Sequence, residues 1–281
     1  MAVLVKSNLQ LRNALNNLGD NVALVPTMGA LHEGHVSLIK LARATVGSKG
    51  CVVVSDFVNP KQFNSEDDYI NYPKDLKEDF LVATSAGANI LWAPEYEDIY
   101  PEPEVKLIDS GYLGEVLEGK DRPGHFDGVL TVVNRLFELV MPKYAVFGHK
   151  DLQQILVIRE FLKSQKIPIN LVVGPTVREI DGLALSSRNS RLSSEERELA
   201  KKIPIALAQG YDAAIAGSRL VEIRQQVRDA LEHPDIKIHY VELLNDQLES
   251  INNDHGWLLV AVTIGRTRLI DNSFIPLGKR N

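Results

Sequence analysis

The sequence has very little cysteine: Cys51 stands alone among 281 residues. One cysteine cannot close an intrachain disulfide, and it cannot supply a zinc site of the cysteine-rich kind. The chain also has no run of about eighteen apolar residues and no leader with a small-residue cleavage site. We therefore expect a soluble, unexported protein of the reducing cytoplasm that does not span a membrane.

Positive charge is scarce as well. The chain has 31 Lys and Arg residues against 37 Asp and Glu residues, so its formal net charge is −6. No basic field is available to collect a nucleic acid or an anionic membrane, and we expect neither as a partner. Hydrophobic residues make up 44% and charged residues 24% of the chain, which excludes the disordered, collagen-like and coiled-coil classes.

Short apolar runs alternate with longer segments of helical period along the first part of the chain. This is the pattern of a parallel sheet wrapped by helices, so we predict an α/β fold. Helices are predicted over 34–44 and 128–140. The predicted strands of the sheet are residues 22–25, 51–55, 90–92, 105–108, 144–147 and 169–173.

The alternation breaks in a charged segment near residue 176, where we place a domain boundary. The prediction is a catalytic domain over 1–176 and a smaller C-terminal α/β domain over 177–281. In the second domain, Ser193 and Glu196 have the spacing of a capping box, which predicts the start of a helix. The predicted strands of this domain are residues 236–244, 257–264 and 268–272.

Two histidines, His32 and His35, lie three residues apart where a helix is expected to follow the strand 22–25. Open parallel sheets bind ligands beyond the carboxyl ends of their strands, and a helix N-terminus there offers free amides and a positive dipole end. Gly29 and Gly34 let the backbone approach closely. The pattern indicates a polyphosphate site. Two alternatives stay open: the imidazoles only cap the helix, or they bind zinc, for which no third ligand is signalled nearby.

A second candidate site follows the predicted strand 144–147. Gly148 precedes Lys150 and Asp151, which supply an ammonium for phosphate and a carboxylate that can accept from a ribose hydroxyl. Gln154 lies at the start of a predicted helix and can both donate and accept. A solvated loop with a surface lysine is the alternative.

Two further motifs carry weaker signals. The segment 185–189 holds two hydroxyls and a guanidinium, which can cover a triphosphate and close over it, although helix capping is the plainer reading. In the segment 56–68, Gln62 can bind a polar substrate, whereas the acidic run 66–68 is most simply a solvated face.

Five motifs follow one another in the chain: PTMGALHEGH, DFVNPKQF, RPGHFDGV with the VVNRLF that follows it, FGHKDLQQ and GLALSSRN. In this order they resemble the pantoate–β-alanine ligase family. The resemblance covers roughly residues 22–192, and the C-terminal part is similar in length and pattern. It implies a Rossmann-like nucleotidyltransferase domain with a smaller C-terminal lid domain.

The resemblance also implies an activity. Members of the family condense (R)-pantoate with β-alanine to pantothenate at the expense of ATP, through an enzyme-bound pantoyl adenylate, and release AMP and pyrophosphate. It implies ATP as a co-substrate, Mg²⁺ held mainly by the ATP phosphates with no metal site made of protein residues, and a cytoplasmic homodimer.

Individual roles follow from the same resemblance. It implies that His35 is the proton donor, that Gln62 contacts pantoate and β-alanine, and that Gln154 holds pantoate. The implied catalytic residues are His32, His35, Lys150 and Arg188. The implied ATP site consists of Met28, Gly29, Ala30, Leu31, His32, Glu33, Gly34, His35, Gly148, His149, Lys150, Asp151, Val177, Leu185, Ser186, Ser187 and Arg188.

The chain departs from the family pattern at four positions. His149 stands where Glu or Gln is common, and Leu185 stands where Met is common. Asp127 stands where Arg often follows His-Phe, and Lys61 stands where a small residue is common. An additional cation at His149 or Lys61 would alter nucleotide or substrate affinity.

Three other functions compete with this interpretation. A nucleotidyltransferase that acts on a phosphorylated acceptor would need further cations for the second phosphate. An aminoacyl-tRNA synthetase fragment would need a basic surface for tRNA, which the negative net charge disfavours. A nucleotide sensor would bind ATP without releasing AMP.

Overall fold

The computed structural model describes residues 2–16, 19–251 and 254–277. The chain divides into two compact units. The first comprises Met1–His149 and Gln153–Pro175, and the second comprises Lys150–Leu152 and Thr176–Asn281. The short segment after residue 149 belongs to the second unit, where the side chain of Asn272 donates to the carbonyl oxygen of Lys150 at 2.9 Å.

The first unit contains a six-stranded sheet in the order β1-β4-β3-β2-β5-β6, and every neighbouring pair is parallel. The predicted α/β fold with a parallel sheet is therefore confirmed. β1 was not predicted from the sequence. The strands are β1 (Val3–Val5), β2 (Val22–Thr27), β3 (Cys51–Asp56), β4 (Ile90–Trp92), β5 (Tyr144–Gly148) and β6 (Asn170–Gly174).

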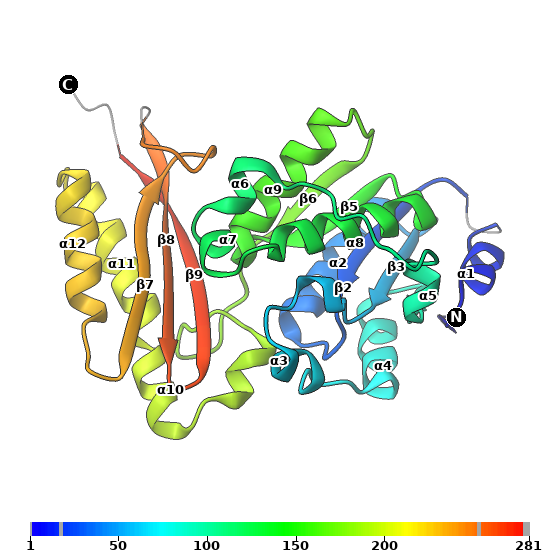
Figure 1. Cartoon of the computed structure of the whole chain (residues 1–281), viewed down its shortest axis with the longest axis horizontal. Helices are drawn as coiled ribbons and strands as arrows, with labels where there is room; N and C mark the ends of the chain where they lie inside the picture. Colours follow the sequence, from blue (N-terminus) through cyan, green and yellow to red (C-terminus); the bar gives the residue numbers. More distant parts are fainter. Residues whose placement is uncertain (1, 17–18, 252–253, 278–281) are drawn as a thin grey trace. The chain divides into compact units, whose positions relative to one another are not determined.

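Helices cover both faces of this sheet (Figure 1). Because side chains alternate along a strand, Val22 and Leu24 of β2 enter one core, and Ala23 and Val25 enter the other. The first core contains side chains of α1 (Asn8–Leu15), α8 (His125–Val140) and α9 (Leu152–Ser164), and the second contains side chains of α2 (Glu33–Val46) and α4 (Leu76–Ala86). The short helices are η1 (Pro60–Gln62), α3 (Glu66–Ile70), α5 (Tyr96–Ile99), α6 (Gly111–Glu115), α7 (Glu118–Asp121) and η2 (His149–Asp151).

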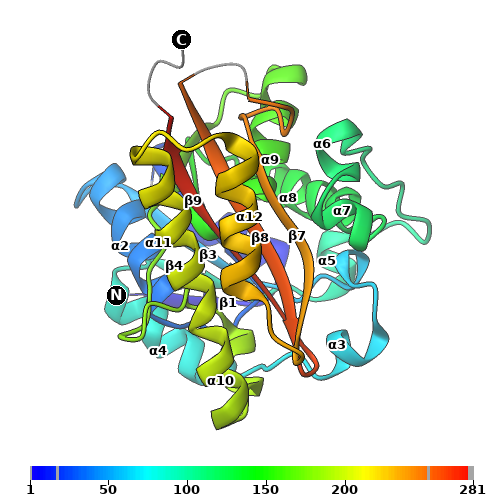
Figure 2. The same ribbon diagram turned by 90° about the vertical axis from the view of Figure 1, so that its left-hand side faces the viewer.

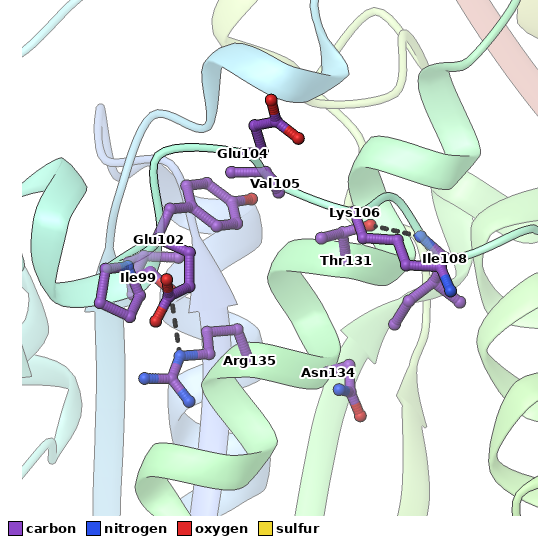
Figure 3. A pocket seen from close by; sticks show the side chains of 11 residues that line it. Ile99, Glu102, Glu104, Val105, Lys106, Ile108, Thr131, Asn134 and Arg135 are labelled. Atoms are coloured by element: carbon purple, nitrogen blue, oxygen red, sulfur yellow. Dashed lines mark hydrogen bonds between the residues drawn. The ribbon is translucent and has the colours of Figure 1, made fainter.

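The strand predicted over 105–108 is wrong, because these residues lie outside the six-stranded sheet. The segment runs beside α8, and the N–H of Ile108 donates to Oγ1 of Thr131 at 2.9 Å instead of to a strand (Figure 3). The segment forms one wall of a pocket of about 520 Å³. Arg135 lies on another side of this pocket, where its Nε donates to the carbonyl oxygen of Ile99 at 3.0 Å.

The second unit is built on an antiparallel sheet in the order β7-β8-β9. Figure 2 shows α11 and α12 across one face of this sheet, and their apolar side chains share a core with the strands. The predicted capping box is confirmed: Ser193 N–H donates to Oε2 of Glu196 at 2.9 Å, and Glu196 N–H donates to Oγ of Ser193 at 3.2 Å. The elements are η3 (Ser187–Arg191), α10 (Ser194–Ala200), α11 (Lys202–Ile215), α12 (Leu220–Leu231), β7 (Ile236–Leu244), β8 (His255–Ile264) and β9 (Thr267–Pro276).

None of the helices in the described ranges is long and apolar enough to cross a membrane.

Candidate active site

The candidate site begins where the strand order of the first unit reverses. β2 lies between β3 and β5, so the chain proceeds from β2 to one side and returns later on the other. The loops after β2 and β5 therefore leave the sheet at neighbouring carboxyl ends, which is where open α/β sheets bind ligands. Met28 follows the end of β2, and His149 follows the end of β5. The two motifs that the sequence singled out thus start from adjacent strands.

The two histidines of the first motif build the start of α2. His32 is the N-cap residue, and its Nδ1 accepts from the N–H of Gly34 at 3.1 Å. Nδ1 of His35 accepts from the N–H of His32 at 3.2 Å. A ring nitrogen that accepts carries no proton, so the neutral form of each imidazole has its hydrogen on Nε2. The cap uses Nδ1 of both rings and therefore does not exclude a phosphate role for Nε2.

The environment of these rings suits an anion better than a metal ion. Their centroids are 4.1 Å apart, and both lie at the positive end of a 14-residue helix. Zinc would need a third protein ligand. In the part of the chain that the structure describes, no group of three or more His, Cys, Asp and Glu side chains is placed to hold a metal ion.

The loop between β2 and α2 has a strained backbone that a buried carboxylate holds. Gly29 has φ +78°, and Ala30 has φ +50°, a region that costs a residue with a Cβ about 1–2 kcal/mol. Asp79 of α4 is 2% exposed and accepts from the N–H of Ala30 at 2.9 Å and from that of Leu31 at 2.6 Å. Asp79 could not be identified from the sequence, because nothing in the pattern of its helix distinguishes it from a surface acid.

A second carboxyl group, that of Asp56, lies against the same loop. Asp56 is the last residue of β3, and its carboxyl group lies close to that of Asp79 beside Gly29. Burial, and next the negative charge of Asp79, raise the pKa of Asp56 to about 7, while Lys74 opposes the shift. Asp56 was part of a motif that the sequence analysis quoted, but no role was assigned to it.

Gln62 lies beside the same loop. Its Nε2 donates to Sδ of Met28 at 3.0 Å, and its Oε1 accepts from Nδ2 of Asn59 at 3.1 Å. Asn59 is 1% exposed, and its Oδ1 accepts from the hydroxyl of Tyr100 at 2.9 Å. The structure thus brings the predicted substrate residue Gln62 next to the predicted ATP residue Met28. Asn59 is a positioning residue that the sequence analysis missed.

The two neighbouring glutamines of α9 differ in their surroundings. Gln153 is 5% exposed and donates to the carbonyl oxygens of Leu113 and Val116 at 2.8 and 2.7 Å, so it holds the chain around α6 and α7. Gln154 is partly exposed. Of the two, Gln154 is therefore the one whose amide is accessible to a ligand.

Two of the four departures from the family pattern have a structural account in the first unit. Burial, and next the charge of Arg159, lower the pKa of His149. This lowered pKa disfavours the additional cation expected at this position. Asp127 accepts from the N–H and the hydroxyl of Ser110 at 2.9 and 2.5 Å, so it orders the chain before α6.

The second unit gathers the remaining predicted residues around β9. Nζ of Lys150 pairs with Asp151 at 3.3 Å. Asp271 is 3% exposed and accepts from both terminal nitrogens of Arg178, at 2.6 and 3.1 Å. Asn272, the next residue, donates to the carbonyl oxygen of Lys150. Two consecutive residues of one strand therefore tie Lys150 to the segment that contains Arg178.

The segment that follows Arg178 is a tight turn that leads into a 3-10 helix. The N–H of Leu185 donates to the carbonyl oxygen of Val177 at 3.0 Å, which brings two predicted ATP residues together. Ser186 caps η3 by accepting from the N–H of Arg188 at 3.3 Å. The side chain of Asn189 donates to Ala184 at 3.0 Å. The capping role that the sequence left open at this motif is therefore present.

The fold and the site together define a Rossmann-like α/β protein in which a helix capped by two histidines begins at the switch point of the sheet. The chain belongs to the pantoate–β-alanine ligase family, whose model matches residues 3–274.

Individual relatives resemble the chain over nearly its whole length. It is 44% identical to a pantothenate synthetase of Aquifex aeolicus, over 97% of this chain and 98% of that protein. A solved pantothenate synthetase of Thermus thermophilus superposes with a TM-score of 0.91 at 39% identity, covering 99% and 100% of the two chains. A pantoate–β-alanine ligase from Francisella tularensis, solved in complex with β-γ ATP and β-alanine, has a TM-score of 0.81 at 36% identity, covering 97% of each chain.

Proposed function

We propose that this protein is a pantoate–β-alanine ligase, which condenses (R)-pantoate with β-alanine to pantothenate and converts ATP to AMP and pyrophosphate. The observation that carries the proposal is the family match over residues 3–274. The helix start at His32 and His35, placed at the switch point of the sheet, supports it independently.

In the first half-reaction, the pantoate carboxylate attacks the α-phosphorus of ATP, and pyrophosphate leaves. Such a transfer needs positioning and neutralisation of charge rather than a protein nucleophile. The positive end of α2 and the Nε2–H groups of His32 and His35 would stabilise the charge on the phosphate oxygens. We propose the same role for the side chains of Lys150 and Arg188.

In the second half-reaction, the neutral amine of β-alanine attacks the carbonyl carbon of the adenylate, and AMP leaves. Gln62 would hold pantoate and β-alanine, and Gln154 would hold pantoate. The segment 185–189 would close to keep water away from the adenylate.

Three further features belong to the proposal. Mg²⁺ would be held mainly by the ATP phosphates, because it retains several waters and needs few protein ligands. The protein would act as a homodimer, and it would work in the cytoplasm. We propose that the first unit binds ATP and pantoate and that the second serves as the lid.

One assay tests the proposed function. AMP release is measured with ATP, pantoate and β-alanine together and with each omitted in turn. The ligase requires all three for turnover, and it shows pyrophosphate exchange with ATP and pantoate alone. AMP release that does not depend on pantoate would contradict the proposal, and so would ATP binding without any turnover.

Replacing Gln62 or Gln154 by alanine is expected to raise the KM for pantoate or β-alanine at least about tenfold, the loss of about 1.5–3 kcal/mol from a hydrogen bond to a charged group. The KM for ATP should change little. Initial rates with each substrate varied in turn measure this. Gln165→Ala, at an exposed position just after α9, is the matched control and should behave as the wild type. An effect confined to ATP would refute the assignment.

A further inference from the structure

Two carboxyl side chains meet beside the loop that leads into α2. Asp56 ends β3, Asp79 lies on α4, and one carboxyl oxygen of each lies within 3.0 Å of the position that a Cβ on Gly29 would take. A hydrogen bond between two carboxyl groups requires a proton on one of them, because two carboxylates have only acceptors. Two carboxyl groups this near each other repel when both are charged, which favours one proton held between them.

The contacts of the pair indicate which side chain is ionised. Both oxygens of Asp79 accept from backbone N–H groups, those of Leu31 and Ala30, and such bonds favour the carboxylate. Asp56 is partly buried and faces the negative charge of Asp79. Asp56 is thus the partner that carries the proton, and Asp79 is the carboxylate that receives it.

The pair lies directly against the loop at Gly29. A Cβ placed on Gly29 would lie 2.4 Å from Oδ1 of Asp56 and 3.0 Å from Oδ2 of Asp79. Both acids therefore occupy the space that a side chain at this position would need. If both were ionised, their repulsion would separate them, and the carboxylate that moves would leave the N–H groups of Ala30 and Leu31.

We propose that Asp56 and Asp79 act as positioning residues for the nucleotide: protonated Asp56 holds the Asp79 carboxylate, which holds the backbone of Ala30 and Leu31 in the shape that binds ATP. Loss of the proton from Asp56 loosens this loop and weakens ATP binding. The inference rests on the proposed function, because it takes this loop to be the nucleotide loop.

The charged groups that face Asp56 determine the pH at which it loses its proton. Asp79, on α4, disfavours the ionised form of Asp56, whereas Lys74, just before α4, favours it. With both present, the pKa of Asp56 is raised to about 7. Removing the charge of Lys74 should therefore move the transition to higher pH.

The test compares the wild type with Asp56→Asn, whose amide can donate to Asp79 at every pH. The Kd of a non-hydrolysable ATP analogue is measured by calorimetry from pH 6 to 9. For the wild type, we expect the Kd to rise about tenfold across the transition, which is within the usual range for two coupled binding events. For Asp56→Asn, this rise should be absent. Titration of the analogue's own phosphate contributes equally to both proteins.

Amide NMR gives a second readout. If Asp56 and Asp79 only stabilised the fold, the amide resonances of the loop would not titrate with Asp56. The ¹⁵N–¹H resonances of Ala30 and Leu31 should titrate near pH 7 in the wild type and stay constant in Asp56→Asn. Asp67→Asn removes one negative charge at an exposed position of α3, and it should titrate as the wild type does. Lys74→Gln should titrate at higher pH, and this variant preserves the test if Asp56→Asn fails to fold.

Identical pH dependence of the Kd and of the resonances in the wild type and Asp56→Asn overturns the inference, as does an unchanged midpoint in Lys74→Gln. The proposed function fails separately, if the wild type releases no AMP at any pH with all substrates present.

Discussion

Replacing His35 by alanine is expected to slow pantoate-dependent pyrophosphate exchange by about tenfold to a thousandfold, the range for removing one group that stabilises charge in a transition state. The imidazole supplies an Nε2–H donor at the start of α2, because its Nδ1 is engaged by the N–H of His32. Exchange of labelled pyrophosphate into ATP reports this half-reaction alone.

His35 also contributes to the cap of α2, so its two roles must be separated. A glutamine three residues after the N-cap can reach back to the N-cap N–H, which makes His35→Gln the matched control. His35→Ala should lose about 0.5–2 kcal/mol of stability with the cap, and His35→Gln should retain most of it. Both variants should lose exchange activity. Exchange near the wild-type rate in a folded His35→Ala protein would remove His35 from the mechanism.

Replacing Gly29 by alanine is expected to disrupt the nucleotide loop. The residue has φ +78°, and an added Cβ would lie only 2.4 Å from Oδ1 of Asp56. The backbone strain costs about 1–2 kcal/mol, and forcing the methyl group against a buried carboxyl pair costs about 1–3 kcal/mol more. Displacing Asp56 also disturbs Asp79 and the N–H groups that it holds. The Kd for the ATP analogue should rise at least about tenfold, or about 1.4 kcal/mol.

The variant Gly217→Ala separates the backbone strain of Gly29→Ala from the cost of its steric clash. Gly217 has φ +83°, and no atom would lie within 4 Å of its Cβ. This variant should therefore lose only the backbone part of the stability and bind the ATP analogue normally. Equal losses of stability in Gly29→Ala and Gly217→Ala, with unchanged ATP binding in both, would show that the carboxyl pair does not restrain the loop. Denaturant unfolding and calorimetry measure the two quantities.

The sheet of the first unit could be largely predicted, because strands buried on both faces are continuous apolar runs. The run 105–108 has the same appearance but is no strand, and Val3–Val5 is a strand that was missed. Both segments are short and apolar, so composition cannot distinguish them. Their neighbours do: Val3–Val5 lies beside β4 and pairs with it, whereas the other segment lies beside α8, whose Thr131 takes up its N–H.

The residues of the candidate site also fall into two groups: those that the sequence could identify and those that it could not. His32, His35 and Gly29 could be identified from the sequence, because a helix start and its cap are local features within a few residues. Asp79 could not, because it meets Leu31 across 48 positions of the chain. Asp271 could not either, because it meets Arg178 across 93 positions. Side chains that hold a site from a distance leave no periodic or spacing signal.

The sequence by itself therefore determined the class of fold and the family resemblance, and it proposed residues for the substrates, since each of these depends on composition, periodicity or short motifs. Only the tertiary structure decided which nitrogen of each histidine is engaged, which glutamine of α9 is accessible, and that two acids lie together beside Gly29. The glutamine and the two acids depend on contacts between segments far apart in the chain, and the histidines depend on the exact backbone conformation at the start of α2. Composition and spacing specify neither.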